Sequence, residues 1–78
     1  MARKSTGGRR REGRILPVAV VERLIRRVGA DRVGASASDA LTDILEAAGL
    51  AIAARASRIA KHAGRKTVTG SDIEMAKG

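Results

Sequence analysis

The feature that most constrains this chain is one long stretch of helical pattern without proline, residues 36–63. Apolar side chains recur along it every three or four residues, which places them on one face of a helix. A helix of this length spans about 40 Å, more than a chain of 78 residues can bury by itself. The segment therefore predicts a long helix whose apolar face is covered by a second chain. That face comprises Leu41, Ile44, Leu45, Ala48, Ile52, Ala56, Ile59 and Ala63.

The middle of this helix, "EAAGLAIAARA" (residues 46–56), consists mostly of small side chains. A glycine inside a helix costs about 1 kcal/mol relative to alanine, and close crossing of two helix backbones would offset that cost at Gly49. The chain has no cysteine and no aromatic residue, so neither a disulfide nor a large side chain stabilises it, and oligomerisation is the expected source of stability. The predicted dimer core is Leu41, Ile44, Leu45, Gly49, Ile52 and Ile59.

Two shorter helices are predicted around the long one. Pro17 and Gly29 bracket an amphipathic segment, because proline suits a first helical turn and glycine a left-handed end. Gly64 is likewise predicted to end the long helix. Ser36 followed by Asp39, and Thr69 followed by Asp72, have the spacing of helix-starting capping boxes. Residues 32–33 and 66–68, in the two connections, are each long enough for a short piece of β pairing. The predicted architecture is all-α, with a folded domain over residues 15–78.

The charges of the long helix are sorted along its length. Asp39, Asp43 and Glu46 lie near its start, whereas Arg55, Arg58 and Lys61 lie near its end. This order complements the helix dipole, which is explanation enough from sequence alone.

Residues 1–14 are predicted to be a flexible basic arm rather than part of the fold. They carry +5 of the formal net charge of +8, and the pI of about 11.5 points to a polyanionic partner. The cations expected to contact that partner are Arg3, Lys4, Arg9, Arg10, Arg11 and Arg14.

Other classes of function fit the composition poorly. One histidine, no cysteine and no inward-facing pair of carboxylates give no nucleophile and base, so neither an enzyme nor a cofactor or metal site is expected. No apolar run approaches 18 residues, which argues for an intracellular protein without a membrane segment. An RNA-binding or ribosomal protein stays open as an alternative, although RNA readers commonly stack bases on aromatic side chains.

Three separate motifs, "GADRV" (residues 29–33), "HAGRKTV" (residues 62–68) and "TGSDIEMA" (residues 69–76), resemble archaeal-type histones. The resemblance runs from about Leu16 to Ala76. It implies the histone fold, a head-to-tail handshake homodimer, and assembly of dimers on double-stranded DNA that is wrapped largely without regard to sequence. It also implies a location on the chromosome and allows other histone isoforms as partners. A histone-fold subunit of a heteromeric transcription complex, which would pair with a different chain, is the closest alternative.

The same resemblance implies roles for individual residues. Arg32 matches the arginine that enters the minor groove, and Thr67 matches the threonine that steadies it from the partner subunit. Lys66 matches a phosphate contact, and Arg23 an arginine that faces the DNA backbone. Arginine suits the narrow, electronegative minor groove, which favours inserted cations.

Two further roles concern an ion pair within the chain and a contact between dimers. Arg65 and Asp72 match an ion pair inside one chain that clamps the second connection to the last helix. His62 matches a histidine that meets Asp72 of another dimer, which would place both residues at a dimer–dimer interface.

Overall fold

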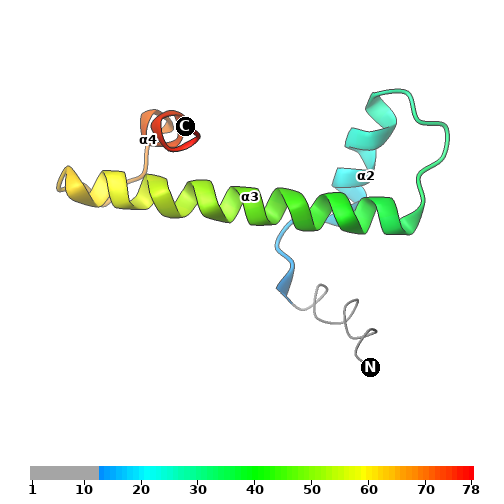
Figure 1. Cartoon of the computed structure of the whole chain (residues 1–78), viewed down its shortest axis with the longest axis horizontal. Helices are drawn as coiled ribbons and strands as arrows, with labels where there is room; N and C mark the ends of the chain where they lie inside the picture. Colours follow the sequence, from blue (N-terminus) through cyan, green and yellow to red (C-terminus); the bar gives the residue numbers. More distant parts are fainter. Residues whose placement is uncertain (1–12) are drawn as a thin grey trace. The chain divides into compact units, whose positions relative to one another are not determined.

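The computed structural model describes residues 13–78, which form three helices (Figure 1). Helix α2 covers Val18–Arg27, α3 covers Ala35–His62 and α4 covers Gly70–Ala76. The predicted all-α class and the short–long–short order of helices are confirmed. Within residues 13–78 neither connection forms a strand, so the predicted β pairing does not occur inside one chain. A stretch of two or three residues needs a second strand beside it to make such pairing.

The chain divides within α3 into two compact units, Met1–Glu46 and Ala47–Gly78. In the first unit, Pro17 is the extended N-cap of α2, with φ −71° and ψ 128°, one residue before the first helical turn. Val21 of α2 is buried, and so are Ser38 and Thr42 of α3. The Thr42 hydroxyl donates to the Ser38 carbonyl at 2.7 Å, which satisfies this buried polar group within the helix.

The start of α3 differs from the prediction. The helix begins at Ala35, and the amides of Ala37 and Ser38 donate to the Gly34 carbonyl. Ser36 therefore lies inside the first turn rather than at the cap. Asp39 accepts from the Arg14 guanidinium at 3.3 Å. The carboxylate that the sequence assigned to a local cap thus forms a tertiary ion pair.

In the second unit, α4 packs on α3 through small side chains. Ala56, Ala60 and Ala76 are its buried apolar residues. The Arg55 Nε donates to the Ala76 carbonyl at 2.9 Å, so an arginine of α3 holds the C-terminal end of α4. The sequence does not predict this contact, because every residue has a backbone carbonyl and nothing in the sequence marks the one that accepts.

The end of α3 follows the predicted glycine signal. Gly64 adopts φ +76°, its amide donates to the Lys61 carbonyl, and the Arg65 amide donates to the Ala60 carbonyl, both at 2.9 Å. This is the Schellman arrangement, which satisfies the last carbonyls of a helix.

None of the six residues of the predicted dimer core is fully buried in one chain. Ile44 is 63% exposed, and Leu41, Leu45, Ile52 and Ile59 are half-buried. A side-chain carbon built onto Gly49 would meet nothing within 4 Å. The single chain thus gives no reason for a glycine at this position, and the dimer core stays a prediction.

We predict that the folded unit is an obligate dimer, with an unfolding midpoint that rises with protein concentration because apolar area is covered only by a partner. Gly49→Leu should lower that midpoint if a second helix crosses at Gly49. Without a crossing, Gly49→Leu should raise it, since leucine is a better helix former than glycine. The measurement is thermal unfolding by circular dichroism at two concentrations a hundredfold apart.

Ala47→Leu is the matched control, because Ala47 is also exposed on α3 and lies away from the Gly49 face. A midpoint independent of concentration, together with a monomer mass in sedimentation, would contradict the dimer.

Candidate nucleic-acid interface

The first unit presents cations on α2. Arg23 is exposed and lines a shallow surface hollow together with Val20, Leu24 and Arg27. Arg26, by contrast, is paired with Glu22 one turn earlier, with its Nη2 2.7 Å from the carboxylate. The two arginines therefore differ in availability to an external anion, although they are three residues apart on one short helix.

Arg32 lies in the connection between α2 and α3. This connection begins with Gly29 at φ +103°, whose amide donates to the Arg26 carbonyl at 3.0 Å and ends α2. Arg32 is exposed, and no ion pair joins it to another residue of the part of the chain that the structure describes. Its guanidinium is thus presented to solvent from a loop, where an external phosphate or groove could receive it.

The second connection presents Lys66 and Thr67, which are both exposed. Arg65 fixes this loop from within: its Nη1 donates to the Thr67 carbonyl at 3.1 Å and to Asp72 Oδ2 at 2.9 Å. Its Nη2 donates to Asp72 Oδ1 at 2.8 Å. The bidentate pair is the one that the resemblance assigned to Arg65 and Asp72, and its effect is to hold the backbone between Lys66 and Val68 in one conformation.

Asp72 is the centre of this arrangement. Its side chain is 2% exposed, and its Oδ2 also accepts from the Thr69 amide at 2.9 Å and the Thr69 hydroxyl at 3.1 Å. The Asp72 amide donates back to the Thr69 hydroxyl, so the predicted capping box is confirmed. The Arg65 guanidinium, and then the Thr69 amide, hold the pKa of Asp72 well below its usual range. The same pair raises the pKa of Arg65.

His62, the last residue of α3, is exposed and lines a surface hollow with Arg58 and Lys61. The expected contact with Asp72 of another dimer stays a prediction. Asp72 leaves little carboxylate surface for it, because the side chain is already buried and bound within its own chain.

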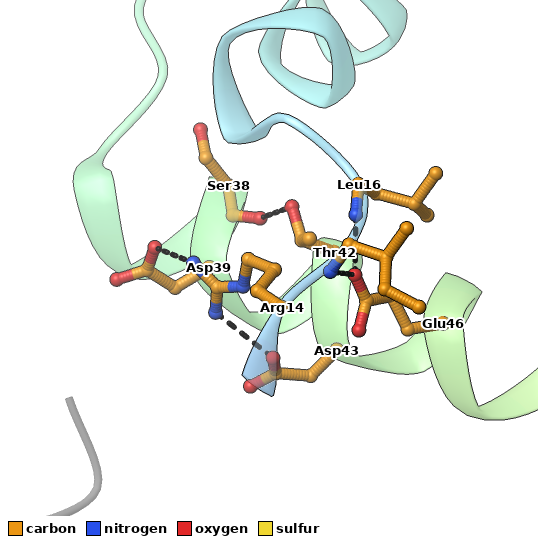
Figure 2. A network of polar contacts seen from close by, with 8 residues as sticks. Arg14, Leu16, Ser38, Asp39, Thr42, Asp43 and Glu46 are labelled. Atoms are coloured by element: carbon orange, nitrogen blue, oxygen red, sulfur yellow. Dashed lines mark hydrogen bonds and ion pairs between the residues drawn. The ribbon is translucent and has the colours of Figure 1, made fainter. Parts of the chain in front are cut away.

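Arg14, which the sequence places among the cations of the arm, meets two carboxylates of α3 in the structure (Figure 2). Its Nη1 donates to Asp39 at 3.3 Å, its Nη2 to Asp43 at 2.9 Å, and its side chain is only 8% exposed. The pKa of Arg14 is raised, mainly by the hydrogen bond to Asp43. Arg14 is thus engaged within its own chain, and its contact with DNA stays a prediction. The other arm cations, Arg3, Lys4, Arg9, Arg10 and Arg11, lie outside the described residues.

The backbone beside Arg14 is held as well, since the amides of Ile15 and Leu16 both donate to Glu46 Oε2. A sequence signal for these contacts exists. Asp39, Asp43 and Glu46 are spaced by four and three residues, which places them on one helix face. From the sequence alone, the helix dipole explains these three carboxylates, because no neighbouring residue indicates an ion-pair partner for them.

Two other kinds of site are not found within residues 13–78. No group of three or more histidine, cysteine, aspartate or glutamate side chains there could hold a metal ion. No helix in that range has the length and hydropathy needed to cross a membrane.

Comparison with known proteins matches residues 14–76 to the family described as histone-like transcription factor (CBF/NF-Y) and archaeal histone. The chain is 44% identical over 61 residues to an archaeal histone of Thermococcus zilligii, a subunit of HAN1, in an alignment that covers 78% of this chain and 91% of that protein. It is 41% identical over 61 residues, with the same two coverages, to probable archaeal histone 3 of Methanocaldococcus jannaschii.

We predict that Asp72→Asn lowers the stability of the folded chain at neutral pH, because it removes the charged partner of Arg65 and weakens the side-chain half of the capping box of α4. The native carboxylate has a lowered pKa, so its stabilisation is complete above about pH 4 and is lost as the pH falls further. The difference in unfolding midpoint between native protein and variant should therefore shrink below about pH 4. Urea unfolding at a series of pH values measures it.

Glu74→Gln is the matched control, because Glu74 is an exposed carboxylate on the same helix whose ion pair with Lys77 is solvated. An equal loss of stability in both variants would contradict the role of Asp72.

Proposed function

The chain belongs to the histone-like transcription factor (CBF/NF-Y) and archaeal histone family, and from that premise we propose that it is a DNA-binding histone that compacts double-stranded DNA. The observation that carries the proposal is the match of residues 14–76, which include both exposed loops, to that family. Two proteins named archaeal histones, matched along 91% of their length, support it. The +8 net charge suits a polyanionic ligand.

In the proposed mechanism the binding unit is a homodimer. Head-to-tail pairing brings the first loop of one protomer beside the second loop of its partner. Arg32 then enters the minor groove, Lys66 binds a phosphate beside it, and Thr67 of the partner subunit steadies the arginine. The exposure of Arg32, Lys66 and Thr67 in the free chain supports this assignment. So does the Arg65–Asp72 clamp, which fixes the backbone that carries Lys66 and Thr67.

Affinity in this mechanism comes from phosphate neutralisation and not from reading bases. The candidate contacts are arginine and lysine side chains, which release counterions from DNA when they bind phosphates. Binding should therefore depend steeply on salt and weakly on sequence. Arg23 on α2 adds a backbone contact, and Arg3, Lys4, Arg9, Arg10 and Arg11 of the arm add local positive charge.

Dimers are proposed to assemble further along DNA, with His62 at the contact between them. The place of action is the chromosome, and the role is packaging without catalysis. Other histone isoforms are candidate partners in mixed dimers.

A role within a heteromeric transcription complex is not favoured. The family description includes histone-like transcription factors, yet both relatives are named archaeal histones. The RNA-binding alternative has no aromatic side chain on which a base could stack.

Nuclease digestion of the protein on long DNA tests the proposal. A ladder of protected fragments that grows in regular steps is the expected result, because dimers that chain along DNA protect multiples of one length. Uniform degradation at saturating protein would overturn it.

We predict that Arg32→Ala weakens DNA binding by about tenfold at moderate salt, as expected for an arginine inserted in a groove. Arg26→Ala removes the same charge but should have a smaller effect, because Glu22 already neutralises Arg26. Losing the Glu22–Arg26 ion pair should lower the free energy of unfolding by only a few tenths of a kcal/mol, as for other exposed pairs one helical turn apart. Fluorescence anisotropy with a short duplex measures both variants. Equal losses of DNA affinity in the two variants would show that Arg32 contributes only its charge.

A further inference from the structure

The junction between the arm and the fold is held by contacts that DNA binding does not require. We name this set the arm anchor: Arg14, Ile15 and Leu16 on one side, and Asp39, Asp43 and Glu46 of α3 on the other (Figure 2). All six residues belong to the first unit. The contacts bridge 25 to 31 positions of sequence, so they are tertiary.

The side-chain half of the anchor suits arginine specifically. Asp39 and Asp43 are one helical turn apart, and the two Nη atoms of one guanidinium reach one carboxylate each. A lysine has a single nitrogen and could not span the pair with the same geometry. Losing one of the two carboxylates would cost free energy, because the Arg14 side chain is only 8% exposed and would be left with a buried, unsatisfied donor. Its Nε already has no hydrogen-bond partner within the part of the chain that the structure describes.

The backbone half of the anchor fixes direction as well as position. Two consecutive amides, those of Ile15 and Leu16, donate to the same oxygen of Glu46. Pro17 follows at once with its φ restricted, and α2 begins at Val18. The chain is thus held from Arg14 to the first turn of α2, and the segment before Arg14 starts from one defined point on α3.

The anchor also separates two populations of positive charge. Arg14 is engaged by Asp39 and Asp43, whereas the arm before it carries five further cations. Three carboxylates of α3 would repel a phosphate backbone, and the anchor engages all three.

We propose that the arm anchor is a positioning device, which fixes where the basic arm leaves the folded chain and thereby determines where the arm contacts DNA. This inference rests on the proposed function. It differs from the simpler view that the arm is a tethered polycation whose charge alone matters. In that view the point of attachment would have no effect on which DNA positions the arm reaches.

The anchor itself is tested without DNA by limited trypsin digestion of the full chain. Cleavage of the bond between Arg14 and Ile15 requires the anchor to open, so its rate reports that opening. Asp39→Asn with Asp43→Asn should raise this rate by about tenfold, the factor expected when contacts to a charged group are lost. The bond after Arg58, inside α3, opens only on wider unfolding and should stay cleaved far more slowly than the bond after Arg14 in native protein and variant alike.

A matched control removes two carboxylates elsewhere. Glu22→Gln with Glu74→Gln abolishes two exposed ion pairs, so it changes the net charge equally and should leave cleavage after Arg14 unchanged. Arg14→Lys is a milder test of the same contact and should also speed cleavage, measured at the new lysine. If none of the anchor variants speeds cleavage after residue 14, the anchor does not hold the chain and the inference fails.

The directing role is tested on DNA with a cleavage reagent attached to the arm. The chain has no cysteine, so Ser5→Cys provides a single attachment point for an iron chelate that cuts nearby DNA. On a duplex with one bound dimer, the native anchor should give discrete cuts. The Asp39→Asn, Asp43→Asn variant should spread the cuts over more positions while binding the duplex at least as tightly, since it loses two negative charges.

The outcomes separate the inference from the proposed function. Identical cut patterns with and without the anchor, on DNA that both proteins bind, would overturn the directing role and leave the histone function intact. Absence of DNA binding by the native protein would overturn the histone function and the directing role together.

Discussion

Helix packing through alanine is the constraint on which this structure depends. In the second unit the buried apolar side chains are Ala56, Ala60 and Ala76, and in the first the only buried apolar residue described is Val21. Alanine lets α4 lie close to α3, but each buried methyl group removes little apolar area from water. Larger side chains such as Ile44, Leu50 and Met75 stay at least 60% exposed. We therefore expect such a chain to complete its core with surface from a partner.

Polar clamps do much of the positioning that a larger core would otherwise do. Arg65 with Asp72 fixes the second loop, and Arg55 holds the end of α4 through a backbone carbonyl. Arg14 holds the start of the fold on α3. In each case an arginine guanidinium joins two separate elements of the chain. The second loop, which carries Lys66 and Thr67, thus has a defined conformation before any DNA is bound, and this lowers the ordering cost of binding.

The positive charge of the protein is divided between two tasks. Arg14, Arg55 and Arg65 donate hydrogen bonds to carboxylates or carbonyls of their own chain, whereas Arg23, Arg32 and Lys66 form no ion pair within residues 13–78. The total of +8 already subtracts the carboxylates, but it does not show where the remaining positive charge lies. The exposed cations lie on α2 and on the two loops, which are the parts that the family resemblance assigned to DNA.

The sequence by itself determined what depends on neighbours along the chain: the order of the helices, the glycine ends at Gly29 and Gly64, and the capping box of Thr69 and Asp72. Motif resemblance added the family and the Arg65–Asp72 pair. Only the tertiary structure decided which charges find each other across 25 or more residues, as Arg14 and Asp39 do, and that α3 starts at Ala35. Local spacing could place three carboxylates on one helix face, but it could not say what would meet them. That depends on how the chain returns to α3, and an arginine looks the same in a sequence whether an aspartate or a phosphate receives it.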